Sequence, residues 1–247
     1  MASKRDELLE YDWRLDGEDA VFCVDLALYN GAPNAGYPIL AYVGCSPKKE
    51  DRELSGGDIR HMVAFCAKCR RRLDLLMAGY IETAKIRQYY FYVASKADYD
   101  ALKLLAEKER SFTCRVGGKK EEDWASYFRI LYPDAAKYQT VRNEEIIAQH
   151  YELGDSDAPR RLNLHFAFLN EPVRRQFEEA ARSEGFAIGG YEEFDGNELP
   201  CGVILHRISA FKKTDVDAVT VQAIRIAEKY NGKLLFWDCP IVPGRGA

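Results

Sequence analysis

Apolar residues recur along this chain at two spacings, every second residue and every third or fourth, and the switches between them predict the order of strands and helices. Alternating runs flank Asp16-Gly17, a dipeptide typical of tight hairpin turns, so we expect the chain to open with a β-hairpin over residues 11–24. Residues 37–45 are apolar on both faces, which is typical of a central strand.

The clearest helical pattern follows this strand. Ser55 or Asp58 can cap its start, its apolar residues continue at helical spacing to Met77, and Gly79 is expected to end it. The other elements predicted for this part of the chain are strands over residues 80–86 and 88–93, a helix that opens at the capping box Ser95–Asp98, and a strand over residues 111–116.

A second series of elements follows a connecting region. Residues 124–151 predict helical structure that Pro133 interrupts, and the polar stretch 154–159 is typical of a linker. We therefore expect one domain over residues 1–153 and a second over residues 154–247. The elements predicted in the second are a strand over 162–168 with one apolar face, a helix capped by Asn170 and ended by Gly185, strands over 186–194 and 201–211, a helix from Thr214 to Tyr230, and a last strand over 233–238.

Both halves thus show the order β-α-β-β-α-β, without a sequence repeat between them. This order is that of the ferredoxin-like, or split βαβ, arrangement. We predict an α+β protein of two tandem ferredoxin-like units, the first with an extra N-terminal β-hairpin and a helical connector.

Composition narrows the class of protein. The 247 residues include 35 basic and 39 acidic side chains, a net charge of −4, which argues against non-specific binding of nucleic acids. The charged N-terminus leads into no apolar segment, and nowhere do about 18 apolar residues run together, so we expect neither a secretory signal nor a membrane span. The seven cysteines are an odd number and suggest reduced thiols, so a cytoplasmic location is expected.

Two stretches of the sequence resemble known families. Residues 160–238 are similar to the RraB family, the regulators of ribonuclease E activity B. Residues 13–133 resemble a bacterial domain of unknown function, number 695, that often precedes RraB-like domains. The motifs behind the first resemblance are Arg160–Phe168, Glu184-Gly185-Phe186, Lys213–Val216 and Ala227–Gly232, and those behind the second are the Trp13 hairpin, Val24–Ala27 and Gln88–Tyr92.

One strand departs from the RraB pattern. This chain has Leu235-Phe236-Trp237 where the family has a polar strand with a glycine before the tryptophan. If that strand contacts a partner protein, this partner is expected to differ from the partner of other RraB-family proteins.

The RraB resemblance implies a ferredoxin-like domain that acts by binding another protein, which in the best-known relative is an RNA-degrading enzyme. Our leading hypothesis is therefore a non-enzymatic regulatory protein that uses an exposed sheet face or edge and needs no cofactor. The alternative is an enzyme or small-molecule binder with a pocket between the two halves, lined by His165, His206 and nearby aromatic residues. Direct RNA binding by a sheet face is the third hypothesis, and the near-neutral charge makes it the least favoured.

Histidines give the best indication of an interaction face. Alternation along residues 162–168 directs Leu164, Phe166 and Phe168 toward the helices, which leaves His165 on the other face of the sheet. In a ferredoxin-like unit the first and third strands are neighbours, so His206 could approach His165. The candidate interaction face consists of Asn163, His165, His206 and Trp237.

Other clusters have a simpler explanation. Cys66 and Cys69 form a CxxC, but no second pair completes a zinc site and Cys66 lies on an apolar stripe, so core packing is favoured. The basic run Lys68–Arg72 is typical of a solvated helix face, and the run Tyr89–Tyr92 of an ordinary strand. The acidic turn that contains Glu192, Glu193, Asp195 and Glu198 is typical of a hairpin tip. We assign no catalytic, metal-binding or cofactor-binding residue.

Overall fold

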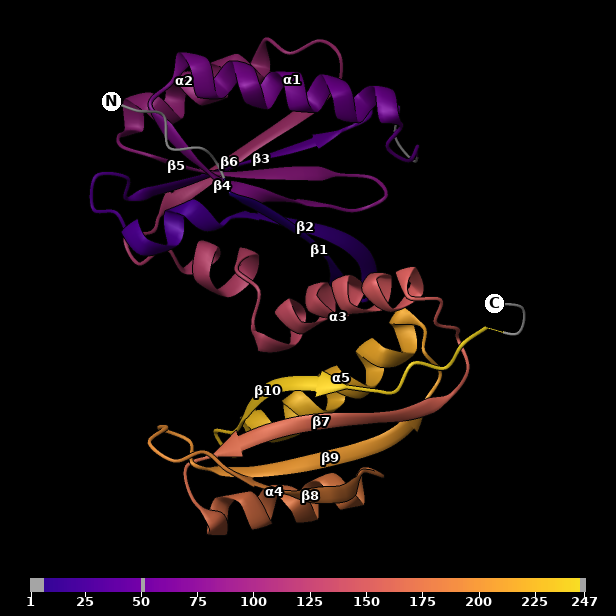
Figure 1. The fold of residues 1–247 in the computed structure, drawn as a ribbon. Helices are drawn as coiled ribbons and strands as arrows, with labels where there is room; N and C mark the ends of the chain where they lie inside the picture. The colour runs from indigo at the N-terminus through magenta and orange to yellow at the C-terminus, as the bar shows by residue number, and fades with distance from the viewer. Residues whose placement is uncertain (1–6, 50–51, 245–247) are drawn as a thin grey trace. The chain divides into compact units, whose positions relative to one another are not determined.

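The computed structural model describes residues 7–49 and 52–244. The chain forms two compact units, residues 1–133 and 134–247, and each unit has one antiparallel sheet with helices (Figure 1). The predicted α+β class is therefore confirmed. Among the described residues, none of the helices has both the length and the apolar character needed to span a lipid bilayer.

The first unit is built on a six-stranded sheet with the strand order β1-β2-β4-β5-β3-β6. Its elements are β1 (Leu8–Leu15), β2 (Glu18–Asp25), the 3-10 helix η1 (Leu26–Gly31), β3 (Ile39–Ser46), α1 (Gly56–Arg72), β4 (Leu75–Glu82), β5 (Arg87–Val93), α2 (Lys96–Glu107), β6 (Thr113–Lys120) and the π-helical turn η2 (Tyr127–Leu131). The expected opening hairpin is β1–β2, and Asp16 and Gly17 at its turn both have positive φ, as a type I′ turn requires.

Helices α1 and α2 lie on the same side of this sheet (Figure 1). Met62, Phe65 and Leu102 from these helices are buried against Val43 and Phe91 of the sheet. On the other side, the segment that follows β6 covers one end of the sheet. Trp124 in this segment stacks on Tyr92 with ring centroids 3.9 Å apart. Among the described residues of the first unit, no helix packs on the rest of that side of β3, β5 and β6.

The end of α1 differs from the prediction. The helix starts as expected, with Ser55 as its N-cap, but it ends at Arg72, and Met77 belongs to β4. Gly79 lies at a shift of register between β4 and β5, where a Cβ atom would be 1.9 Å from the carbonyl oxygen of Cys23. This glycine therefore permits close approach of two strands and does not end a helix.

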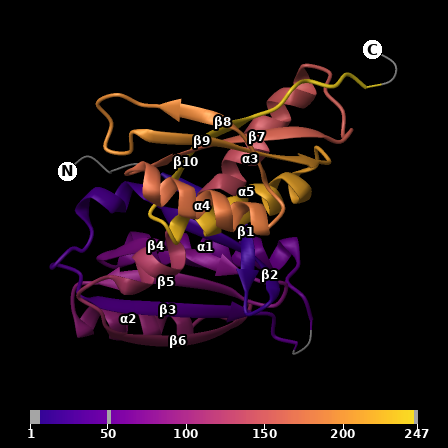
Figure 2. The same cartoon turned by 90° about the horizontal axis from the view of Figure 1, so that it is seen from below.

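The second unit contains a four-stranded sheet with the strand order β10-β7-β9-β8. Its elements are α3 (Ala135–Glu152), β7 (Arg160–Phe168), α4 (Glu171–Ser183), β8 (Ala187–Glu193), β9 (Cys201–Ser209), α5 (Lys213–Glu228) and β10 (Lys233–Asp238). Helices α4 and α5 lie next to each other along one side of this sheet (Figure 2). Phe177 of α4 packs there against the rings of Phe166 and Phe168.

Helix α3 belongs to the second unit, whereas the boundary expected at residue 153 placed it in the first. The reason is the buried side chain of Asn143. Its Nδ2 donates to Asp217 Oδ1 at 2.7 Å and to Thr220 Oγ1 at 2.8 Å, both on α5, and its Oδ1 accepts from Trp237 Nε1 on β10 at 2.7 Å. A buried amide needs such partners, and α5 and β10 supply all three.

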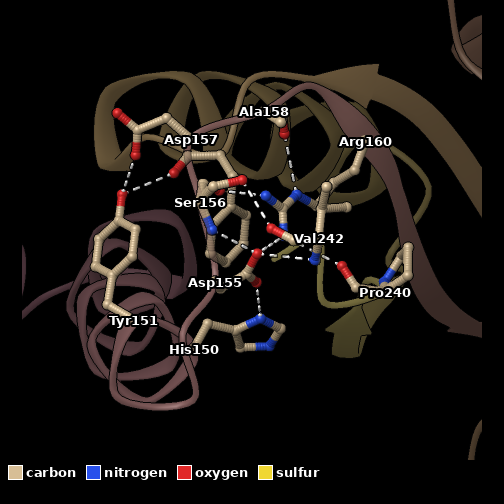
Figure 3. A network of polar contacts seen from close by, with 10 residues as sticks. His150, Tyr151, Asp155, Ser156, Asp157, Ala158, Arg160, Pro240 and Val242 are labelled. Atoms are coloured by element: carbon tan, nitrogen blue, oxygen red, sulfur yellow. Dashed lines mark hydrogen bonds and ion pairs between the residues drawn. The ribbon is translucent and has the colours of Figure 1, made fainter. Parts of the chain in front are cut away.

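Residues 154–159 were expected to form a linker, but in the structure Asp155 of this stretch is buried in a polar network that Ser156 and Ala158 also join (Figure 3). The Asp155 carboxylate forms an ion pair with Arg160, contacts His150 Nδ1 at 2.7 Å, and accepts from the backbone N–H of Ser156 at 2.8 Å and of Val242 at 2.9 Å. Arg160 in turn donates to the carbonyl oxygen of Pro240 at 3.1 Å. The network therefore ties the start of β7 to the segment after β10.

These contacts set the ionisation of Asp155. Burial alone would raise the pKa of this carboxyl, but the hydrogen bonds from Arg160, His150 and the two backbone N–H groups outweigh burial and hold the pKa well below its ordinary range. An acid whose pKa is lower in the folded state stabilises that state above its unfolded pKa of about 3.9, and the stabilisation is lost as the pH falls toward the folded pKa.

We predict that Arg160→Met destabilises the second unit by about 3–5 kcal/mol near neutral pH, because it leaves Asp155 ionised and buried without its cation. The cost should shrink as the pH falls below about 4, since a protonated Asp155 needs no cation. Hydrogen exchange of the β7 amides at several pH values measures both effects.

The matched control is Arg175→Met on α4, where Arg175 forms an exposed ion pair with Glu171. Its cost should stay below about 1 kcal/mol at every pH. Equal costs for the two variants, or a cost of Arg160→Met that does not change with pH, would contradict the importance given to this network.

Candidate functional site

The side of the second sheet that faces away from α4 and α5 is formed by alternate residues of its strands. Leu162, Leu164, Phe166 and Phe168 of β7 are fully buried on the helix side, so Asn163 and His165 between them lie on the opposite side. The strand register places His206 beside Asn163, Ile204 beside His165 on one flank, and Phe236 beside His165 on the other. We call this surface the open face; its members are Arg161, Asn163, His165, Glu192, Ile204, His206, Ile208, Phe236 and Asp238.

His165 is held at the centre of the open face by two carboxylates. Its Nδ1 lies 2.8 Å from Glu192 Oε2, and its Nε2 lies 2.8 Å from Asp238 Oδ2. The ring also stacks on Phe236 with centroids 4.1 Å apart. The two carboxylates thus hold the imidazole in one orientation through both of its nitrogens.

The polar network extends across the sheet from this cluster. Asn163 Nδ2 donates to Asp238 Oδ1 at 2.8 Å, and Arg161 Nε donates to Asn163 Oδ1 at 2.8 Å. Each side chain therefore holds its neighbour in one orientation. Both nitrogens of His165 are already engaged, so this ring cannot act as a general base or bind a metal ion without breaking one of these contacts. The arrangement suits a fixed recognition surface better than catalysis.

His206 is also on the open face, but it does not reach His165, because Ile204 is the residue of β9 opposite His165. Its Nδ1 is buried and has no hydrogen-bond partner among the described residues. Burial, and next the positive charge of Arg161, lower the pKa of this imidazole. The neutral form of His206 is thus favoured.

Trp237 lies on the helix side and not on the open face. It pairs with Leu164, is 4% exposed and donates its Nε1–H to Asn143. Phe236 instead occupies the position on the open face that was expected for Trp237, and it is 51% exposed. The register between β10 and β7 shifts between Leu234 and Phe236. Because the run from Leu234 to Trp237 is apolar at every position, the sequence pattern does not show which of its side chains point toward the helices.

The remaining candidates behave largely as expected. Cys66 and Cys69 are buried in the core of the first unit, as are all four residues from Tyr89 to Tyr92, and Arg70 to Arg72 are exposed. Of the acidic residues expected at the hairpin tip, Glu192 lies on β8 and binds His165, which sequence reasoning missed because the contact spans β9, the strand between β8 and β7. Within residues 7–49 and 52–244, no group of three His, Cys, Asp or Glu side chains is arranged to hold a metal ion.

Fold and site together define an α+β protein whose second unit has an ordered sheet face of mixed apolar and charged character on the side away from α4 and α5. Residues 140–239 match the family described as regulator of ribonuclease activity B (RraB), and residues 10–132 match a family of unknown function (DUF695). The chain therefore carries a DUF695 region followed by an RraB-family region, and the resemblance seen in the sequence is confirmed.

Other comparisons add little. A search of curated proteins finds no match. Among solved structures, an unknown protein from Galdieria sulphuraria aligns at 9% identity over 83% of this chain and 98% of its own, with a TM-score of 0.24. A similarity this low carries no argument about fold or function.

We predict opposite consequences for the neighbours Trp237 and Phe236. Trp237→Ala should destabilise the second unit by about 3–5 kcal/mol, because it opens a cavity and removes one of the two donors to Asn143 Oδ1, the other being Gln139 Nε2. Phe236→Ala should cost about 1 kcal/mol, since its ring is half exposed. Hydrogen exchange of β7 and β10 amides in the two variants measures the difference, and a larger cost for Phe236→Ala would contradict the assigned facing.

Proposed function

We propose that this protein is a non-enzymatic regulator that binds another protein through the open face of its second unit, and that the partner is an RNA-degrading enzyme. The observation that carries the proposal is the exposure of two large apolar side chains, Ile208 at 73% and Phe236 at 51%, on the same sheet face as the fixed His165 network. The RraB-family match over residues 140–239 supports the class of partner.

Physical chemistry supports a protein partner for such a face. Interfaces concentrate binding energy in a few large apolar or aromatic anchors, and surrounding polar groups set orientation and specificity. Ile208 and Phe236 would serve as anchors, while the carboxylates of Glu192 and Asp238 would select a partner segment that carries Lys or Arg. Because hydrogen bonds already order these polar side chains, binding costs little side-chain entropy.

The proposal includes the finer description of the fold. The strand orders β4-β5-β3-β6 and β10-β7-β9-β8 both place the first and third strands of a β-α-β-β-α-β series in the centre of the sheet. This supports two tandem ferredoxin-like units, with the β1–β2 hairpin added at the edge of the first. We also propose that the protein works in the cytoplasm, where RNA-degrading enzymes act.

The experiment is capture of partners on the tagged full chain from a native lysate treated with ribonuclease to remove bridging RNA. We expect stoichiometric recovery of an RNA-degrading enzyme. Ile208→Asp should weaken binding of that enzyme at least thirtyfold, the effect of losing about 2 kcal/mol at an anchor, as measured with purified proteins by calorimetry.

The matched control is Leu104→Asp, a comparable apolar-to-acidic change at an exposed leucine on α2 of the first unit, outside the open face. This variant should bind like the parent chain. Recovery of no RNA-degrading enzyme would contradict the proposed partner, and equal loss of binding in both variants would contradict the proposed face.

A further inference from the structure

A groove of about 620 Å³ lies on the first unit, on the side of the sheet opposite α1 and α2. It is formed by β3, β5 and β6 together with the turn between β4 and β5 and the segment that follows β3. This is the end of the sheet that the Trp124 segment leaves uncovered. Its volume is within the range of small-molecule sites.

Two glycines shape the floor of the groove. The register of β3 and β6 places Gly117 opposite Tyr42 and Gly44 opposite Arg115, so each glycine stands beside a large side chain. A Cβ atom on Gly117 would be 2.3 Å from the Tyr42 ring, which shows that the ring lies over the bare backbone of β6. Tyr42 is 36% exposed, so part of its ring remains accessible from the groove.

The groove is positively charged, whereas the whole chain has a net negative charge. Four cationic side chains line it, Lys49, Arg52, Lys85 and Arg115, and none of the described residues that line it carries a carboxylate. Arg52 is neutralised by two hydrogen bonds of 2.8 Å to Asp58. Lys49 and Arg115 form no ion pair with any described residue. A chain with a net charge of −4 thus concentrates positive charge on one hollow surface.

The side-chain amide of Gln88 also lines the groove. Gln88 Nε2 donates to the hydroxyl of Tyr90 at 2.7 Å, which orients the side chain and leaves its Oε1 near Gly44 as an acceptor. Cations for a phosphate, an aromatic ring for a base and a fixed acceptor for a base edge are the groups that recognise nucleotides on a sheet surface.

We propose that this groove binds a ribonucleoside phosphate, either a free nucleotide or a nucleotide of single-stranded RNA. The phosphate contacts Arg115 and Lys49, and the base stacks on Tyr42. The site is on the first unit, so this proposal does not depend on the protein partner of the open face.

The test is fluorescence anisotropy of the full chain with two probes, a labelled single-stranded RNA octamer and labelled AMP. Unlabelled octamer, AMP and inorganic phosphate serve as competitors. Arg115→Gln should weaken binding at least tenfold and reduce the salt dependence by about 0.7 in log–log slope, the share of one phosphate contact. Tyr42→Leu should weaken binding about tenfold, whereas Tyr42→Phe, which keeps the ring, should bind normally.

Arg71→Gln is the charge-matched control, because Arg71 is exposed on α1, away from the groove. It should bind like the parent chain, and circular dichroism should show that every variant is folded. Competition by AMP as strong as by the octamer supports a free-nucleotide site, and competition by RNA alone supports an RNA site. The proposal is overturned if neither probe binds, if Arg71→Gln weakens binding as much as Arg115→Gln, or if inorganic phosphate competes as well as AMP and Tyr42→Leu has no effect.

Discussion

The alternation of side chains along β7 is the constraint on which the second unit depends. Leu162, Leu164, Phe166 and Phe168 are all fully buried, and each contributes about 1.5–3 kcal/mol by leaving water. A shift of one residue would expose all four, so the register of β7 is strongly held. The same constraint directs Asn163 and His165 to the other side of the sheet. The open face and its His165 network are thus a direct consequence of how the core forms.

Local patterns were enough to predict most elements, because caps, turns and periodicity act within a few residues. The Asp16-Gly17 turn and the facing of His165 are examples. What could not be predicted depends on contacts far apart in sequence. Met77 fits a helical stripe and a strand equally well, the unit that α3 joins depends on Asn143 finding Trp237 and α5, and the facing of Phe236 depends on a local shift in strand register. Glu192 reaches His165 only because β8 pairs with β9.

The two sheets present surfaces of different character. The open face of the second unit combines exposed apolar side chains with a network of paired charged side chains, whereas the groove of the first unit is basic and contains an exposed aromatic ring. The near-neutral net charge of the sequence does not reveal either surface, because like charges gather on one surface only after the strands have paired. A regulator of RNA degradation that contacts an enzyme with one unit and a nucleotide with the other would use each surface for the ligand that its charge favours.

Hydroxyl-radical footprinting of the full chain, free and in complex with its captured partner, tests the central claim most directly. We predict that Ile208 and Phe236 become protected from oxidation in the complex, while the exposed leucines Leu104 and Leu153 remain as reactive as in the free chain. Unchanged oxidation of Ile208 and Phe236 in a saturated complex would contradict the claim that the open face of the second sheet is the binding surface.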